Sequence, residues 1–160
     1  MQSQTHADPQ PGALSVQQVF RRVLEDLLPL AEAKNIDIGV ADALDAQVVA
    51  PEVDLVTLVK NLVDNAIRFT PPGGRIDLAV QPGPGPVVLW VRDTGPGIPL
   101  AEQGRVFDPF YRLLGHDNTG SGLGLSIVQA IAARIGAQVQ LGSADPSLQT
   151  GLAVKVVFNQ

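Results

Sequence analysis

The chain has 160 residues, of which 45% are hydrophobic and 17% are charged, and its formal net charge is −5. This length and composition predict one globular domain with its own core, rather than a disordered chain. The negative charge argues against binding along a nucleic-acid backbone. No apolar run approaches the roughly 20 residues of a membrane-spanning helix, so we expect no direct membrane insertion. The absence of cysteine excludes disulfides and thiolate metal sites and fits a reducing compartment.

The first part of the chain predicts a tail, a helix and two short strands. Residues 1–13 are mostly polar and are expected to be disordered or foreign to the domain, which would then span 14–160. Apolar residues recur at helical spacing over residues 16–33, which predicts an amphipathic helix. Pro29 should kink this helix or end it early. Short strands are expected at 36–40 and 47–49.

A second helix is expected to begin at Pro51 and to end at the Pro-Pro-Gly-Gly sequence of residues 71–74. A rotation of about 100° per residue gives it a broad apolar face and a polar stripe. The stripe contains Asp54, Thr57, Asn61, Asp64, Asn65 and Arg68. An ordinary solvated face is one interpretation. However, asparagine is a poor residue for a helix interior, and an amide oxygen is a suitable ligand for Mg²⁺.

The second half of the chain predicts four strands, a long connection and a third helix. Alternating or apolar runs predict strands at 76–80, 87–91, 139–141 and 152–158 and a helix at 123–135 that ends at Gly136. The irregular connection at 99–120, with a short helix at 101–106, has the length of a functional lid. The order of elements predicts a two-layer α/β (α+β) sandwich, in which about three helices cover one face of a mixed, mainly antiparallel sheet.

Two glycine-rich segments indicate a ligand site: residues 93–97 (DTGPG) after an apolar strand, and 120–125 (GSGLGL) directly before a helix. Glycines let the backbone approach a ligand, and a helix N-terminus attracts anions. The second segment fails the dinucleotide-binding fingerprint and the phosphate-loop pattern. Asp93-Thr94-Gly95 also matches the aspartic-protease triplet, but such enzymes need a second carboxylate, and the chain has no second copy. The combination favours nucleotide binding.

Four motifs, in order, resemble those of the ATP-binding catalytic domain of bacterial two-component sensor histidine kinases. Residues 61–70 (NLVDNAIRFT) resemble the asparagine box and 93–99 (DTGPGIP) the first glycine box. Residues 106–112 (VFDPFYR) resemble the phenylalanine box and 120–125 the second glycine box. The wider superfamily, which includes DNA gyrase, heat-shock chaperone and mismatch-repair ATPases, shares the Bergerat fold. The phenylalanine box favours the kinase branch.

The resemblance implies roles for individual residues. Asp93 would accept a hydrogen bond from the exocyclic amine of adenine, and Asn65 would bind Mg²⁺. Arg68 and Arg112 would contact phosphate oxygens, while Asn61 would help to hold the metal and phosphate end. The remaining implied nucleotide contacts are Phe69, Gly95, Gly97, Ile98, Tyr111, Gly120, Ser121, Gly122, Leu123, Gly124 and Leu125.

The implied function is transfer of the γ-phosphoryl group of ATP to a histidine on a separate dimerisation and phosphoacceptor domain, for relay to a response-regulator aspartate. The domain would belong to the cytoplasmic portion of an inner-membrane receptor and be monomeric by itself. No phosphoacceptor histidine box is present, and His6 lacks its context, so we expect ATP binding without self-phosphorylation. Asn61 stands where hydrolysing relatives usually carry a glutamate. The alternatives are a superfamily ATPase or anti-sigma serine kinase, and a non-catalytic nucleotide-binding module.

Overall fold

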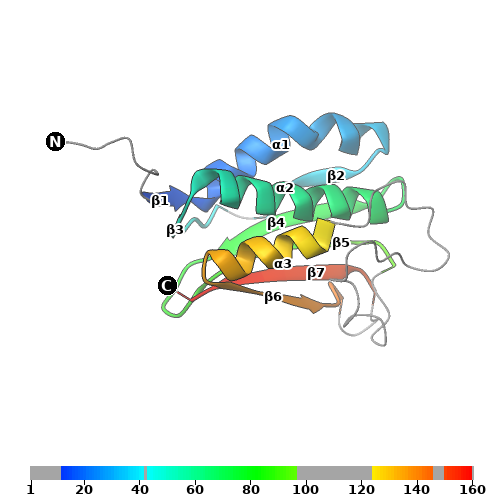
Figure 1. Ribbon diagram of the computed structural model, residues 1–160. Helices are drawn as coiled ribbons and strands as arrows, with labels where there is room; N and C mark the ends of the chain where they lie inside the picture. The colour runs from blue at the N-terminus through cyan, green and yellow to red at the C-terminus, as the bar shows by residue number, and fades with distance from the viewer. Residues whose placement is uncertain (1–11, 42, 97–123, 146–149, 160) are drawn as a thin grey trace.

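The computed structural model describes residues 12–41, 43–96, 124–145 and 150–159. In these residues, three helices lie against one face of a five-stranded sheet, which forms a two-layer sandwich (Figure 1). The elements are β1 (Gly12–Ser15), α1 (Val16–Ala33), β2 (Asp37–Val40), β3 (Gln47–Ala50), α2 (Glu52–Phe69), β4 (Arg75–Gln81), β5 (Val87–Asp93), α3 (Gly124–Arg134), β6 (Ala137–Gly142) and β7 (Leu152–Phe158). The predicted connection at 99–120 and its short helix lie outside the described residues.

The strand order of the main sheet is β2-β4-β5-β7-β6. β2 pairs with β4 in parallel, and the other neighbours pair antiparallel. The prediction of a mixed, mainly antiparallel sheet with helices on one face is therefore confirmed. β5 is the central strand, and Asp93 is its last residue. A side chain at this position is held by pairing on both sides.

The core lies between the helices and the inner face of the sheet. Leu58 and Val59 of α2 are fully buried, as are Leu78 of β4, Leu89 of β5 and Val156 of β7. Along each central strand these inward residues alternate with residues on the opposite face, as the pleat of a strand requires. The apolar face predicted for α2 is therefore its contact surface with the core.

Helix α1 has the limits that its apolar spacing predicted. The hydroxyl of Ser15 caps its first turn by accepting a hydrogen bond from the Gln18 N–H at 3.2 Å. The expected early end at Pro29 is wrong, because the helix continues to Ala33. Burial of Leu27 and Ala31 on either side of the proline compensates for the missing backbone hydrogen bond.

A small second sheet precedes α2. β3 forms close to its predicted position, but it pairs antiparallel with β1, a strand that was not expected, and lies outside the main sheet. Asp45 supports this corner: its carboxylate accepts hydrogen bonds from the hydroxyl of Ser15 at 2.6 Å and from the N–H of Gln17 at 3.0 Å.

None of the helices formed by the described residues combines the length and apolar character needed to cross a membrane.

Candidate nucleotide-binding site

Asp93 is a buried acid whose side chain points to the helix side of the sheet. It is 4% exposed, and its Oδ1 accepts hydrogen bonds from the N–H groups of Gly95 at 2.9 Å and Leu152 at 3.2 Å. Burial raises the pKa of Asp93 to about 6, although the two N–H donors act in the opposite direction. Both hydrogen bonds end on Oδ1, so Oδ2 has no donor among the described residues and remains an acceptor for a ligand.

Gly95 packs against the end of α2. A Cβ atom at this position would lie 2.9 Å from the carbonyl oxygen of Phe69 and 3.1 Å from Oδ1 of Asp93. These distances are too short for any side chain, so the close approach of this backbone to Phe69 requires glycine at position 95. The first glycine segment therefore brings Asp93 next to the last residue of α2.

Asn65 lies one turn earlier on α2 and faces the start of α3. Its Oδ1 is 3.7 Å from the position that a Cβ atom would occupy on Gly124. The asparagine-rich stripe and the end of the second glycine segment are therefore neighbours. Phe69 packs against Gly95, next to Asp93, and Asn65 faces Gly124. Phe69 and Asn65 are four residues apart on α2, which is about 6 Å along the helix axis.

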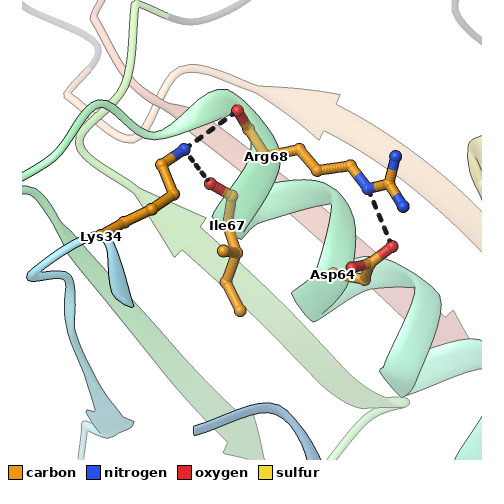
Figure 2. Close-up of polar contacts among 4 residues, drawn as sticks. All are labelled: Lys34, Asp64, Ile67 and Arg68. Carbon is orange, nitrogen blue, oxygen red and sulfur yellow. Dashed lines mark hydrogen bonds and ion pairs between the residues drawn. The ribbon is translucent and has the colours of Figure 1, made fainter. Parts of the chain in front are cut away.

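The other two predicted polar residues of α2 make local contacts. The amide nitrogen of Asn61 donates to the carbonyl oxygen of Thr57 at 2.8 Å, within its own helix. Nε of Arg68 donates to Oδ2 of Asp64 at 3.0 Å (Figure 2). The Arg68 side chain is 38% exposed. A phosphate contact from Arg68 would require its guanidinium group to be shared with Asp64 or to leave it.

Lys34 supports the same end of α2, and the sequence analysis did not identify it. Its Nζ donates to the carbonyl oxygens of Ile67 at 2.7 Å and Arg68 at 3.3 Å (Figure 2). Burial lowers the pKa of Lys34. The carbonyl of Lys34 also accepts a hydrogen bond from the N–H of Gly73 at 3.2 Å. A cation at the C-terminus of a helix compensates its unpaired carbonyls and its dipole.

Gly151 beside Asp93 and Thr70 at the end of α2 were not among the predicted site residues. The N–H of Gly151 donates to the carbonyl of Gly95 at 2.8 Å, and Gly151 has a φ of +72°, which favours glycine. Thr70 follows α2 and is fully buried, and its Oγ1 has no hydrogen-bond partner in the described part of the chain. Neither contact has a sequence signal, because each depends on how distant segments pack.

Only Gly124 and Leu125 of the second glycine segment are described, and the predicted lid at 99–120 lies outside the described residues. Gly124 is the first residue of α3, and Leu125 is buried beneath it. The predicted contacts that lie outside the described residues, and stay predictions, are Gly97, Ile98, Tyr111, Arg112, Gly120, Ser121, Gly122 and Leu123. Within the described ranges, no three acidic or histidine side chains gather as a metal site.

Comparison with known proteins places this geometry in a family. The family model "Histidine kinase-, DNA gyrase B-, and HSP90-like ATPase" matches residues 50–159, which is more than half of the chain. The curated relatives include the swarming motility regulation sensor protein RssA of Serratia marcescens, 36% identical over 115 residues. That alignment covers 71% of this chain and 24% of RssA. Sensor protein QseC of Escherichia coli K12 is 36% identical over 151 residues, covering 89% of this chain and 32% of QseC.

Solved structures show the same fold. The mycobacterial sensor histidine kinase MprB superposes with a TM-score of 0.79 at 32% identity, covering 92% of this chain and 96% of that chain. The catalytic domain of histidine kinase ThkA also superposes with a TM-score of 0.79, at 24% identity, and supports the fold alone. The present chain spans between about a quarter and a third of the length of RssA and QseC.

Proposed function

Because the chain belongs to the histidine kinase-, DNA gyrase B- and HSP90-like ATPase family, as an ATP-binding catalytic domain of the sensor histidine kinase type, we propose that it donates the γ-phosphoryl group of ATP to a histidine on a separate domain. One observation carries the proposal: Asp93 and Asn65 lie at the same end of α2, where the two glycine segments meet it. A single nucleotide can therefore reach both residues.

The adenine end of the proposed site is Asp93. Its Oδ1 is fixed by two N–H donors, and its Oδ2 can accept a hydrogen bond from the exocyclic amine of adenine. Guanine presents a carbonyl oxygen at the corresponding position, which the carboxylate would repel. Gly95 lets the backbone after Asp93 pack closely against the carbonyl of Phe69. These features support adenine as the base.

The phosphate end of the proposed site is Asn65 together with the N-terminus of α3. An amide oxygen is a hard ligand, and Mg²⁺ commonly combines one or two protein oxygens with nucleotide phosphates and water. This donor set fits Mg²⁺ without the acidic cluster that the described residues lack. Bound there, Mg²⁺ would neutralise charge on the phosphates. The first N–H groups of α3 could bind a phosphate oxygen, and Arg68 and Arg112 would add positive charge.

Positioning and charge neutralisation are the main demands of phosphoryl transfer, so the site needs no nucleophile of its own. Asn61 cannot take a proton from water, which favours delivery to an external acceptor over hydrolysis. We propose that this acceptor is a histidine of the dimerisation domain of a cytoplasmic receptor segment. A response-regulator aspartate would then receive the phosphoryl group.

The first test measures the affinity of the purified chain for ADP with and without Mg²⁺, by calorimetry. The expected result is binding that Mg²⁺ strengthens and that Asp93→Asn weakens by roughly tenfold or more, about the value of a hydrogen bond to a charged group. Asp77→Asn is the control, because Asp77 lies on β4 and projects from the other face of the sheet. Absence of ADP binding by the unchanged chain would refute the proposal.

The second test supplies the helical phosphoacceptor domain of a sensor kinase such as QseC in trans, with ATP labelled at the γ-position. The expected result is acid-labile label on that domain, and none on a variant whose acceptor histidine is replaced. Release of inorganic phosphate is followed in the same mixture. Rapid release with no transfer would favour the ATPase alternative, and ADP binding with neither would favour a non-catalytic module.

A further inference from the structure

A pocket of about 330 Å³ opens on the face of the sheet that the described helices leave uncovered. Its polar lining comes from Arg75, Asp77, Arg92, Asp93, Thr94, Asp145 and Thr150. Asp77 and Arg92 stand opposite each other on β4 and β5. Their neighbours Ile76 and Asp93 are buried on the helix side, so the alternation of a strand places Asp77 and Arg92 on the outer side. We name this the outer-face pocket.

Arg92 is the unpaired cation of the outer-face pocket. None of the ion pairs among the described residues involves it, and its Nε is buried without a hydrogen-bond acceptor there. Its guanidinium carbon lies 5.2 Å from the centre of the Trp90 ring. Arg75 differs, because its Nε is bonded to Asp77 at 3.0 Å. The cation–π contact attracts the Arg92 guanidinium to the ring but provides no oxygen for its N–H donors.

A buried donor without an acceptor is costly, and a planar guanidinium group is well suited to a planar carboxylate. The charge of the pocket limits which anion fits. Asp77, which is paired with Arg75, and Asp93 and Asp145 also line it, and these carboxylates would repel a doubly charged phosphate more strongly than a singly charged carboxylate. The volume suits a small organic molecule.

We propose that the outer-face pocket binds a small monocarboxylate, whose oxygens accept hydrogen bonds from Arg92. The pocket adjoins the proposed nucleotide site, because Asp93 is among its lining residues, but the side chains of Arg92 and Asp93 lie on opposite faces of β5. It does not depend on the proposed kinase function. A carboxylate bound to Arg92 would contact the strand that carries Asp93.

The test uses butyrate as the probe and butyramide, which has the same shape and no charge, as its control. The chain contains one tryptophan, and the Trp90 ring contacts Arg92, so its fluorescence reports on a ligand bound to that residue. The expected result is a saturable change in Trp90 fluorescence as butyrate is added, and binding of butyramide that is weaker by at least roughly tenfold. The comparison uses the unchanged chain, so it does not depend on whether a variant folds. Equal affinity for the two probes would overturn the proposal.

Backbone amide NMR then locates the probe. Shifts centred on Arg92, Thr94 and Thr150 support the outer-face pocket, whereas shifts centred on Asn65 and Gly124 would contradict it. Arg92→Gln should weaken butyrate binding by roughly tenfold or more. Arg21→Gln is the matched control, because Arg21 is an exposed residue of α1 and should leave the affinity unchanged. Unchanged binding in Arg92→Gln would refute the role of this residue.

Discussion

The N–H of Leu152 donates to Oδ1 of Asp93 at 3.2 Å, although the two residues are 59 positions apart in the chain. They are also cross-strand partners at one end of the β5–β7 ladder. The register of two central strands thereby orients the carboxylate that we assign to adenine. A shift of one residue in this register would turn the β7 side chains to the wrong face and would break this hydrogen bond.

The raised pKa of Asp93 predicts a pH dependence of stability. Its pKa is about 6 in the folded chain, against an ordinary value of 3.8 for an aspartate. The protonated form is therefore favoured by folding, and this contribution is full below about pH 4 and is lost as the pH rises through about 6. Relative to Asp93→Asn, the unchanged chain without nucleotide should lose about 3 kcal/mol of unfolding free energy over this interval. Urea unfolding of both chains between pH 4 and 7 measures the difference, and parallel curves would contradict it.

The same pKa predicts how nucleotide affinity depends on pH. An ionised Asp93 is the better acceptor for the adenine amine, so ADP should bind more tightly as the pH rises from 5 to 7. Adenosine, which lacks phosphates, separates this effect from titration of the nucleotide itself. Asp93→Asn should remove the pH dependence of adenosine binding. A dependence that persists in Asp93→Asn would assign it to another group.

Gly95→Ala is expected to destabilise the chain and to weaken ADP binding. The added Cβ atom would lie 2.9 Å from the Phe69 carbonyl, so the backbone must move, at a cost of about 1–3 kcal/mol. Gly39→Ala is the control, because a Cβ atom there meets nothing within 4 Å and the φ angle is not positive. Thermal unfolding of the two variants compares them. Similar melting temperatures would show that the Phe69–Gly95 contact is not close-packed.

Lys34→Met should lower the unfolding free energy by about 1–2 kcal/mol, because two carbonyl groups at the end of α2 lose their charged donor. Lys60→Met is the matched control. The Nζ of Lys60 lies 4.0 Å from Asp26, and both side chains are at least half exposed, so the loss should be below about 0.5 kcal/mol. Chemical denaturation measures both variants. Equal losses would mean that Lys34 does not hold the helix end.

Asn61→Glu is expected to increase ATP hydrolysis by roughly tenfold or more, because a carboxylate one turn before Asn65 can act as a base toward water. Asn61→Gln is the control, because glutamine is as long as glutamate but carries a neutral amide, and it should give no increase in hydrolysis. Release of inorganic phosphate is the measurement, with ADP affinity as a check that the site remains intact. An unchanged rate in a variant that binds ADP would count against the position assigned to Asn61.

Local patterns predicted most of the fold. The limits of α1 follow from its apolar spacing and the Ser15 cap, and the ends of α2 follow from Pro51 and the sequence of residues 71–74. The strand β1 was missed because four residues beside a polar tail carry too little periodicity to be distinguished. Its partner β3 was expected, but no local signal shows that it pairs outside the main sheet.

The site was predictable where one element carries it, as in the polar stripe of α2. The contacts of Lys34 with the end of that helix, and of Leu152 with Asp93, join residues 33 or more positions apart. Such contacts depend on tertiary packing, which overrides local preference. The same limit applies to Arg68, whose sequence position suggested a phosphate contact but whose Nε is bonded to Asp64.

The contacts of Gly95 with Phe69 and of Gly124 with Asn65 anchor both flanks of residues 97–123 to one helix, a single turn apart. Closing a loop between fixed, neighbouring points becomes only slightly more costly as it lengthens, by about 0.6 kcal/mol for each doubling. Insertions or deletions between these anchors should therefore leave the purine and phosphate contacts of α2 intact. The number of residues between 97 and 123 could therefore differ among related chains while Asn65 and Phe69 keep their places on α2.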